Sequence, residues 1–172
     1  EGIEVMALYG PGDGTAGGGS PPAPFRGLDE PASVTVRLPR PMHVAQMGTG
    51  RRIGLTQGFT TGVRPWWATM FAVSERKLQP PILQPADGVA RRGGNFEILL
   101  TIPDAQGLHA VKVRVEDPDG RAAPWFDRGV IVENGEARLI VPIAYNERAG
   151  SWRLTATDLY TDEAASIRFE IR

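Results

Sequence analysis

Cysteine is absent from the 172 residues of the chain, and histidine occurs only twice, as His43 and His109. Without cysteine there are no disulfides and no thiolate metal ligands. Because many exported bacterial proteins also lack cysteine, its absence does not indicate the cellular compartment. No third imidazole accompanies the two histidines, which lie far apart in the sequence. The sequence therefore predicts no zinc site and no cofactor.

A charge excess is also missing, since 19 Lys and Arg nearly balance 20 Asp and Glu. Proteins that bind nucleic acid have a clear basic excess, so we expect no such partner. No apolar run approaches the roughly 20 residues that span a bilayer, and we expect no membrane insertion. Because the chain starts with Glu1 instead of Met, we expect it to be part of a longer polypeptide.

Recognisable catalytic motifs are missing too. There is no Gly-x-Ser-x-Gly nucleophile elbow, and the carboxylates cluster in predicted turns and on solvent faces. The Gly/Pro-rich stretch 10–31 lacks the Gly-Lys-Ser/Thr ending of a phosphate-binding loop. We therefore predict no catalytic residue and do not expect this chain to be an enzyme by itself.

Glycine and proline are plentiful, with 21 and 15 residues, and apolar residues alternate with polar ones over many short stretches. The strongest pattern runs from Asp127 to Asn146, on both sides of Asn134-Gly135. Asn-Gly favours a type I′ turn, so a β-hairpin is predicted in which Glu133 faces Glu136, Val132 faces Ala137 and Val130 faces Leu139. The other face carries Ile131 and Ile140, which we expect to contact another domain or chain.

The second half of the chain has the strand spacing of an immunoglobulin-like or fibronectin-III-like sandwich of about seven strands. Strands are predicted at 82–84, 95–102, 108–116, 127–133, 136–141, 152–157 and 164–171. The proline-rich stretch 76–86 reads as a connector, so the sequence predicts an all-β fold of two β-sandwich domains. Their expected limits are 1–78, with the loop 10–31, and 79–172.

The first domain is expected to be irregular. Its predicted strands are 2–9, 32–38, 42–47, 52–57 and 66–74, with Phe25 anchoring the long loop, Pro39 and Pro41 ending the second strand, and turns over 58–65. The strand 66–74 carries bulk on both faces, so we expect it to be central in its sheet.

Four aromatic residues are candidates for ligand binding, namely Trp66, Trp67, Trp125 and Phe126. A flat aromatic face can stack on a sugar ring, whereas the alternative for each is packing in a core or between domains. Asp117-Pro118-Asp119-Gly120 could offer oxygen ligands to Ca²⁺, but its residues are also those of an ordinary β-turn. His109 is expected to be partly buried at a sheet rim, and His43 is expected on the surface.

Two segments resemble parts of a known family. VAQMGTGRRIGLTQGFTTGVRPWWATMFAV, at 44–73, looks like a pattern of strand, Thr-Gly turn, strand and Pro-led strand near the C-terminal end of large bacterial glycoside hydrolases of the β-galactosidase type. The segment 107–171, with Gly-Leu-His, Val-x-Asp-Pro-Asp-Gly and Gly-x-Trp-x-Leu-x-Ala-Thr-Asp, is similar to the Ig-like module that closes such chains. The resemblance implies an accessory region, and it transfers no catalytic residue.

These observations predict a non-catalytic accessory module of a larger, exported bacterial carbohydrate-active protein, located outside the cell or in the periplasm. It would pack against neighbouring domains of the same polypeptide or associate with polysaccharide. The alternative is a structural or adhesive surface protein, in which the sandwich mediates protein–protein assembly.

Overall fold

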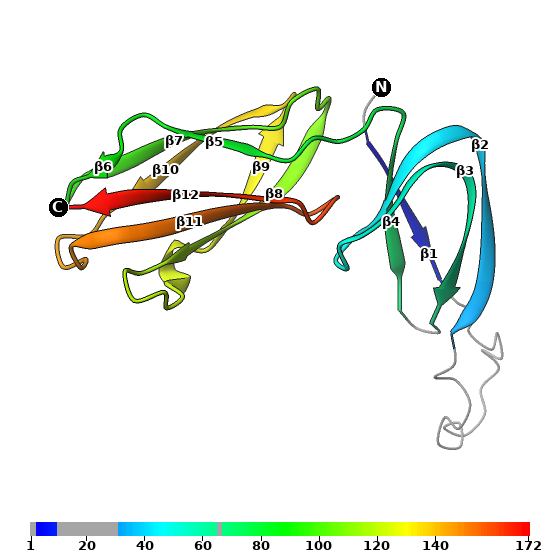
Figure 1. Ribbon diagram of the computed structural model, residues 1–172, viewed down its shortest axis with the longest axis horizontal. Coiled ribbons are helices and arrows are strands. Elements are labelled where there is room, and N and C mark those ends of the chain that lie inside the picture. The colour runs from blue at the N-terminus through cyan, green and yellow to red at the C-terminus, as the bar shows by residue number, and fades with distance from the viewer. Residues whose placement is uncertain (1–2, 10–30, 65–66) are drawn as a thin grey trace, which may run out of the picture.

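The structure, a computed structural model, describes residues 3–9, 31–64 and 67–172. These residues form two β-sheets (Figure 1), which confirms the expected all-β class of two β-sandwich domains. The first sheet has the strand order β1-β4-β2-β3 and comprises β1 (Glu4–Leu8), β2 (Ala32–Gln46), β3 (Arg51–Val63) and β4 (Thr69–Ser74). The limits 1–78 and 79–172 stay a prediction.

The second sheet has the order β5-β7-β10-β9-β8-β11-β12-β6. It comprises β5 (Ile82–Pro85), β6 (Val89–Ala90), β7 (Asn95–Thr101), β8 (Leu108–Glu116), β9 (Arg128–Glu133), β10 (Glu136–Pro142), β11 (Gly150–Asp158) and β12 (Ala164–Ile171), with the 3₁₀ turn η1 (Pro124–Phe126) before β9. All seven strands predicted in this half are present. The two-residue strand β6, which pairs in parallel with the end of β12, was not predicted.

β2 and β3 of the first sheet form a long hairpin that bends over a small core. β2 pairs with β3 on both sides of a register shift between Arg37 and Met42, so the prediction that Pro39 and Pro41 end the strand is wrong. The prolines lack N–H donors and interrupt the ladder without ending the extended backbone, because the strand bends there. The bend in the hairpin (Figure 1) brings Phe59 of β3 onto Phe71 of β4, with ring centroids 5.0 Å apart.

β4 lies between β1 and β2, as expected of the strand with bulk on both faces. It starts at Thr69 and not at residue 66, and β3 extends to Val63, so the turns predicted over 58–65 begin too early. The alternation of residues 58–63 is hidden by Gly58 and Gly62, which carry no side chain to reveal a face. Phe25 and most of the loop 10–31 lie outside the described residues.

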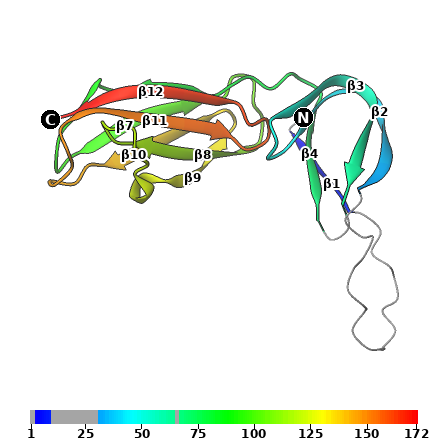
Figure 2. The same ribbon diagram turned by 60° about the horizontal axis from the view of Figure 1, so that its bottom comes forward.

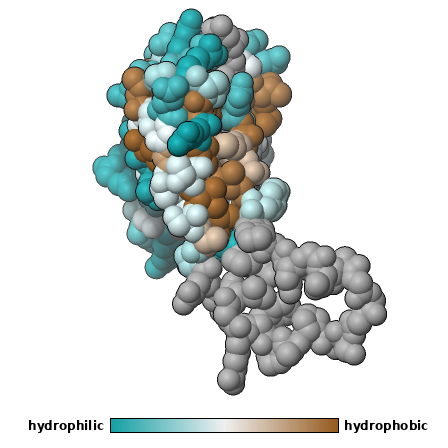
Figure 3. Space-filling view, turned by 90° about the vertical axis from the view of Figure 1, so that its right-hand side faces the viewer, coloured by the Kyte–Doolittle hydropathy of each residue, from teal (hydrophilic) through white to brown (hydrophobic). Residues whose placement is uncertain are grey.

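The core of the first sheet is only partly covered. Met42, Val44, Phe59, Phe71 and Val73 are buried, but the neighbouring Met6 and Leu38 are only half-buried. Both line an open hollow between β1 and the bend of β2. Figure 3 shows the molecule from the side of the first sheet, where apolar surface gathers.

The second sheet closes on itself as a two-layered sandwich (Figure 2). One layer is β5-β7-β10, and the other is β9-β8-β11-β12 with β6 at its edge. Their inner faces share one large core, in which Phe96 of β7 stacks on Phe169 of β12 with ring centroids 4.4 Å apart. The outer face of each strand is exposed to solvent, so apolar and polar residues alternate along it, and this alternation predicted the strands from the sequence.

The Asn134-Gly135 turn has the positive φ values predicted for it, 50° and 84°, and Glu133 faces Glu136. Beyond that pair the ladder stops, because β9 continues beside β8 and β10 continues beside β7. The predicted pairs of Val132 with Ala137 and of Val130 with Leu139 are therefore not part of the recorded register. The Arg128 guanidinium donates to the Ile140 carbonyl at 2.8 Å and bridges the diverging strands.

The two sheets meet at the turn that joins β11 to β12. The Asp162 carboxylate accepts a hydrogen bond from the Gly50 amide at 2.6 Å, and Glu163 forms an ion pair with Arg52. His43, half-buried, lines a pocket of about 90 Å³ beside these contacts. Ligand sites usually take about 300 Å³ or more, so this pocket fits water better than a ligand.

Substituting Gly135 tests the turn. At φ 84°, a Cβ would also lie 2.8 Å from the Ile102 carbonyl oxygen, so Gly135→Ala is expected to lower the free energy of unfolding by about 1–3 kcal/mol. Gly129→Ala on β9 is the matched control, because a Cβ there meets nothing within 4 Å. Urea unfolding measures both variants, and equal stability of Gly135→Ala and the parent chain would contradict the turn geometry.

Candidate functional site

The candidate site lies at one end of the second sandwich, where the β8–β9 connection meets the loop between β10 and β11. The first connection contains the turn at Asp117 to Gly120 and η1. The second contains Tyr145, Asn146, Glu147 and Arg148. Pro118 packs against Gly150, the first residue of β11, where a Cβ would come within 3.0 Å of the proline ring, so the first loop lies against the end of the second.

The predicted β-turn at Asp117-Pro118-Asp119-Gly120 is present. Gly120 has φ 78°, and its amide donates to the Asp117 carbonyl at 2.9 Å. The Asp117 Oδ1 atom accepts hydrogen bonds from the amides of Asp119 at 2.8 Å and Arg121 at 2.9 Å. Asp117 therefore uses one carboxylate oxygen to hold its own turn, as Asp often does.

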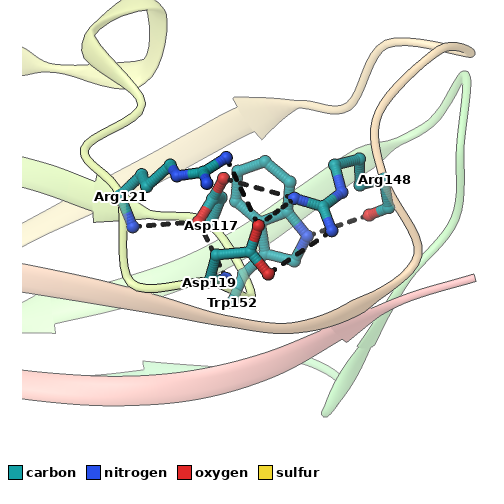
Figure 4. A network of polar contacts seen from close by, with 5 residues as sticks. All are labelled: Asp117, Asp119, Arg121, Arg148 and Trp152. Atoms are coloured by element: carbon teal, nitrogen blue, oxygen red, sulfur yellow. Dashed lines mark hydrogen bonds and ion pairs between the residues drawn. The ribbon is translucent and has the colours of Figure 1, made fainter.

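Arginines neutralise the two carboxylates of this turn (Figure 4). Arg148 Nη1 lies 2.6 Å from Asp119 Oδ2 and 3.7 Å from Asp117 Oδ2, and Arg121 Nη1 lies 3.5 Å from Asp119 Oδ2. The hydrogen bond and the charge of Arg148 lower the pKa of Asp119 below its usual value. A cation at this turn would compete with guanidinium groups already placed there, which disfavours the Ca²⁺ interpretation.

The four aromatic candidates have different surroundings. Trp125 is 64% exposed, and its indole N–H donates to Glu147 Oε1 at 3.0 Å. The adjacent Phe126 is buried, and its ring meets Trp152 edge-on at 5.7 Å. Trp67 is 73% exposed and precedes β4, in the other sheet, and Trp66 lies outside the described residues.

Trp125 lines an open hollow together with Asp117, Asn146, Glu147, Arg148 and Trp152. The floor is fixed, because the Trp152 indole N–H donates to the Arg148 carbonyl at 3.0 Å. The hollow thus combines one exposed aromatic face with amide, carboxylate and guanidinium groups. Such a set suits a ligand that has both an apolar face and many hydroxyl groups.

Sequence reasoning missed the contribution of the loop at 145–148. Tyr145 is 82% exposed, and its ring lies on Gly93, where a Cβ would come within 2.3 Å of it. Glu147 and Arg148 orient Trp125 and Asp119. The only available signal was a run of polar residues with a Tyr between two predicted strands, a composition that ordinary turns share.

A second polar cluster is buried at the opposite end of this sandwich. His109 and Asp158 are fully buried, so the expectation that His109 sits at a sheet rim is wrong in its degree of burial. His109 Nδ1 lies 3.7 Å from Asp158 Oδ1, and neither ring nitrogen makes a hydrogen bond to any described residue. Asp158 accepts from the Thr161 hydroxyl at 2.8 Å and the Tyr160 amide at 3.3 Å, so its role is to hold the turn before β12.

Within the described ranges, no group of three or more His, Asp and Glu residues lies close enough to hold a metal ion. Within the same residues, no helix has the length and hydropathy needed to cross a bilayer. Among the described residues, we take Trp125 and its polar neighbours as the candidate site, because they combine an exposed aromatic ring with polar side chains in one hollow.

Comparison with known protein families finds no match, and comparison with curated proteins finds none either. Solved structures with a similar chain path include the CARDB domain of a Pyrococcus furiosus protein in complex with di-metal ions, at 17% identity and a TM-score of 0.36. It aligns with 56% of this chain and 95% of its own. The chicken interferon gamma receptor alpha chain aligns at 9% identity and a TM-score of 0.35, covering 83% of this chain and 98% of that chain.

An isomalto-dextranase of Arthrobacter globiformis T6, complexed with panose, aligns at 13% identity and a TM-score of 0.30, over 99% of this chain and 30% of that chain. The structural neighbours thus include a CARDB domain and a glycoside hydrolase. All three TM-scores are below 0.5, so these likenesses say nothing about what this chain binds.

The ion pair of Asp119 with Arg148 makes the free energy of unfolding depend on pH. Because the folded-state pKa of Asp119 is lowered, its contribution to stability is present above the unfolded-state pKa and is lost as the pH falls through the folded-state value. Carboxyl NMR titration should show a low pKa for Asp119 that rises towards about 3.9 in Arg148→Gln. An unchanged titration in the variant would contradict the pairing.

The buried pair predicts unequal effects on stability. His109→Leu should change the free energy of unfolding by less than about 1.5 kcal/mol, because no hydrogen bond is lost and the volume is similar. Asp158→Ala should cost about 2–4 kcal/mol, because it leaves the Thr161 hydroxyl and the Tyr160 amide without their acceptor. Thermal and urea unfolding measure both variants. A loss of unfolding free energy above that bound in His109→Leu would contradict the absence of a hydrogen bond to the His109 ring.

Proposed function

We propose that this chain is a non-catalytic accessory module of a larger, exported bacterial carbohydrate-active protein, and that it associates with glycan through the hollow beside Trp125. The observation that carries the proposal is the exposed Trp125 ring. Its indole N–H donates a hydrogen bond to Glu147, which fixes the ring beside a cluster of polar side chains. The resemblance of 44–73 and 107–171 to accessory regions of bacterial glycoside hydrolases supports the same class of ligand.

The geometry suits a sugar for two reasons. The exposed face of Trp125 offers apolar area to the C–H face of a pyranose ring, and the fixed ring loses little conformational freedom on binding. Asn146 lines the same hollow, and its amide could bond to the hydroxyl groups at the edge of the sugar. Arg148 is already paired with Asp119, which favours a neutral glycan over an acidic one.

The contact between the two sheets supports the packing role. The Asp162 carboxylate and the Glu163 side chain both come from one short turn, and both bind the β2–β3 hairpin end at Gly50 and Arg52. Two polar contacts from one turn orient the first sheet relative to the second. The loops around Trp125 lie at the other end of the sandwich and stay open.

Native affinity electrophoresis tests the glycan proposal. The chain should be retarded in gels that contain a soluble neutral polysaccharide, with galactan, xylan, lichenan and dextran as the probes. Trp125→Ala should lose about 2 kcal/mol of binding free energy, enough to remove the retardation. Trp67→Ala is the matched control, because it removes a similarly exposed indole that lies just before β4 of the first sheet.

Retardation of Trp125→Ala equal to that of the parent chain would contradict the assignment of this surface. Loss of retardation in Trp67→Ala alone would move the glycan site to the first sheet. Failure of the parent chain to bind any of the four probes would contradict glycan association itself.

A further inference from the structure

An apolar patch lies on the outer face of the layer β9-β8-β11-β12, at the end of β8 opposite to the Trp125 loops. Its members are Leu108 and Ala110 of β8, Ile131 of β9 and Leu159, which follows β11. Ile131 faces Ala110 in register, and the Leu159 amide donates to the Ala110 carbonyl at 2.9 Å from the other side. The four residues are therefore neighbours across adjacent strands.

Three of the four side chains are well exposed, with 60% of Leu108, 60% of Ile131 and 38% of Leu159 accessible. Further along the same face the outward residues are polar, as with Lys112, Arg114 and Thr155. The apolar side chains are thus confined to one end of the face. Ile131 and Ile140 do not lie on one face as predicted, because Ile131 pairs with Ala110 on β8, whereas Ile140 pairs with Glu97 on β7, in the other layer.

The charges beside the patch make it self-complementary. Glu133 faces Leu108 on one side of the row formed by Ile131 and Ala110, and Lys112 faces Gly129 on the other side. Consider two copies packed face to face, related by a two-fold axis that lies between them and runs across the strands along the Ile131–Ala110 row. This axis places the Glu133 side of one copy over the Lys112 side of the other. It would place Glu133 of one copy over Gly129 of the other, where no side chain obstructs it, and beside Lys112.

From this arrangement we propose that a second copy of this chain docks on the patch, with its strands antiparallel to those of the first copy. Ala110, Ile131 and Leu159 lie on the axis and form the apolar centre, and the aliphatic part of Lys112 from each copy covers Leu108 of the other. Two symmetry-related ion pairs between Glu133 and Lys112 set the register. The patch is small, so the dimer is weak and forms only at high protein concentration.

The dimer would leave the Trp125 loops free, because they lie at the other end of β8. Each dimer would then present two glycan-binding sites, and both could bind one polysaccharide chain with higher avidity. The proposed dimer does not depend on the proposed function, because self-association is measured without any glycan.

Sedimentation equilibrium of the full chain, over about 10 µM to about 1 mM, tests the dimer. The weight-average mass should rise from monomer towards dimer, and Ile131→Arg should keep the chain monomeric at every concentration. Ile140→Arg is the matched control, because it adds the same charge to an exposed isoleucine on the outer face of the other layer. Circular dichroism checks that both variants are folded.

A charge exchange tests the register. Lys112→Glu and Glu133→Lys should each weaken the dimer about tenfold, and the double variant should restore it to within about threefold of the parent chain. A parent chain that stays monomeric, a dimer that survives Ile131→Arg, or a double variant no better than the single ones would each overturn the proposal. Binding of a different protein to a monomeric parent chain would overturn it as well.

Discussion

The divergence of β9 and β10 after Asn134-Gly135 is the constraint on which the second sandwich depends. A two-residue turn joins the strands, yet β9 continues in the layer of β8 and β10 in the layer of β7. The turn is therefore the point at which the sheet folds over, and Val132 and Leu139 are buried between the layers as a result. Closing the sandwich in this way leaves both its ends to loops, and the candidate site occupies one of them.

The two ends of the sandwich have different roles. At one end, the turn before β12 is held from within by Asp158 and contacts the first sheet through Asp162 and Glu163. At the other end, Asp117 fixes a tight turn, and Arg148 links this turn to the loop that orients Trp125. Internal hydrogen bonds therefore fix the loops at each end, one end in contact with the first sheet and the other at the surface where we propose that glycan binds.

The sequence predicted those features in which one physical requirement dominates. β8 and β12 have the predicted bounds because burial on one side imposes strict alternation, and the Asp117 turn follows from local side-chain bonding. Long-range choices were not predictable. Nothing local indicates that β9 and β10 separate, that β2 bends at Pro39 and continues, or that Trp125 is exposed while Phe126 is buried. The last choice is made by η1, which turns Phe126 towards Trp152.

The proposed function places glycan on the surface around Trp125. The most direct measurement is an NMR titration of the ¹⁵N-labelled chain with oligosaccharides of the polysaccharide that retards it. Binding at Trp125 predicts shifts that saturate and cluster on the Trp125 indole N–H and the amides of Asn146 and Arg148, with the Trp67 indole unchanged. Saturating shifts confined to the first sheet, or no shifts at millimolar sugar, would contradict it.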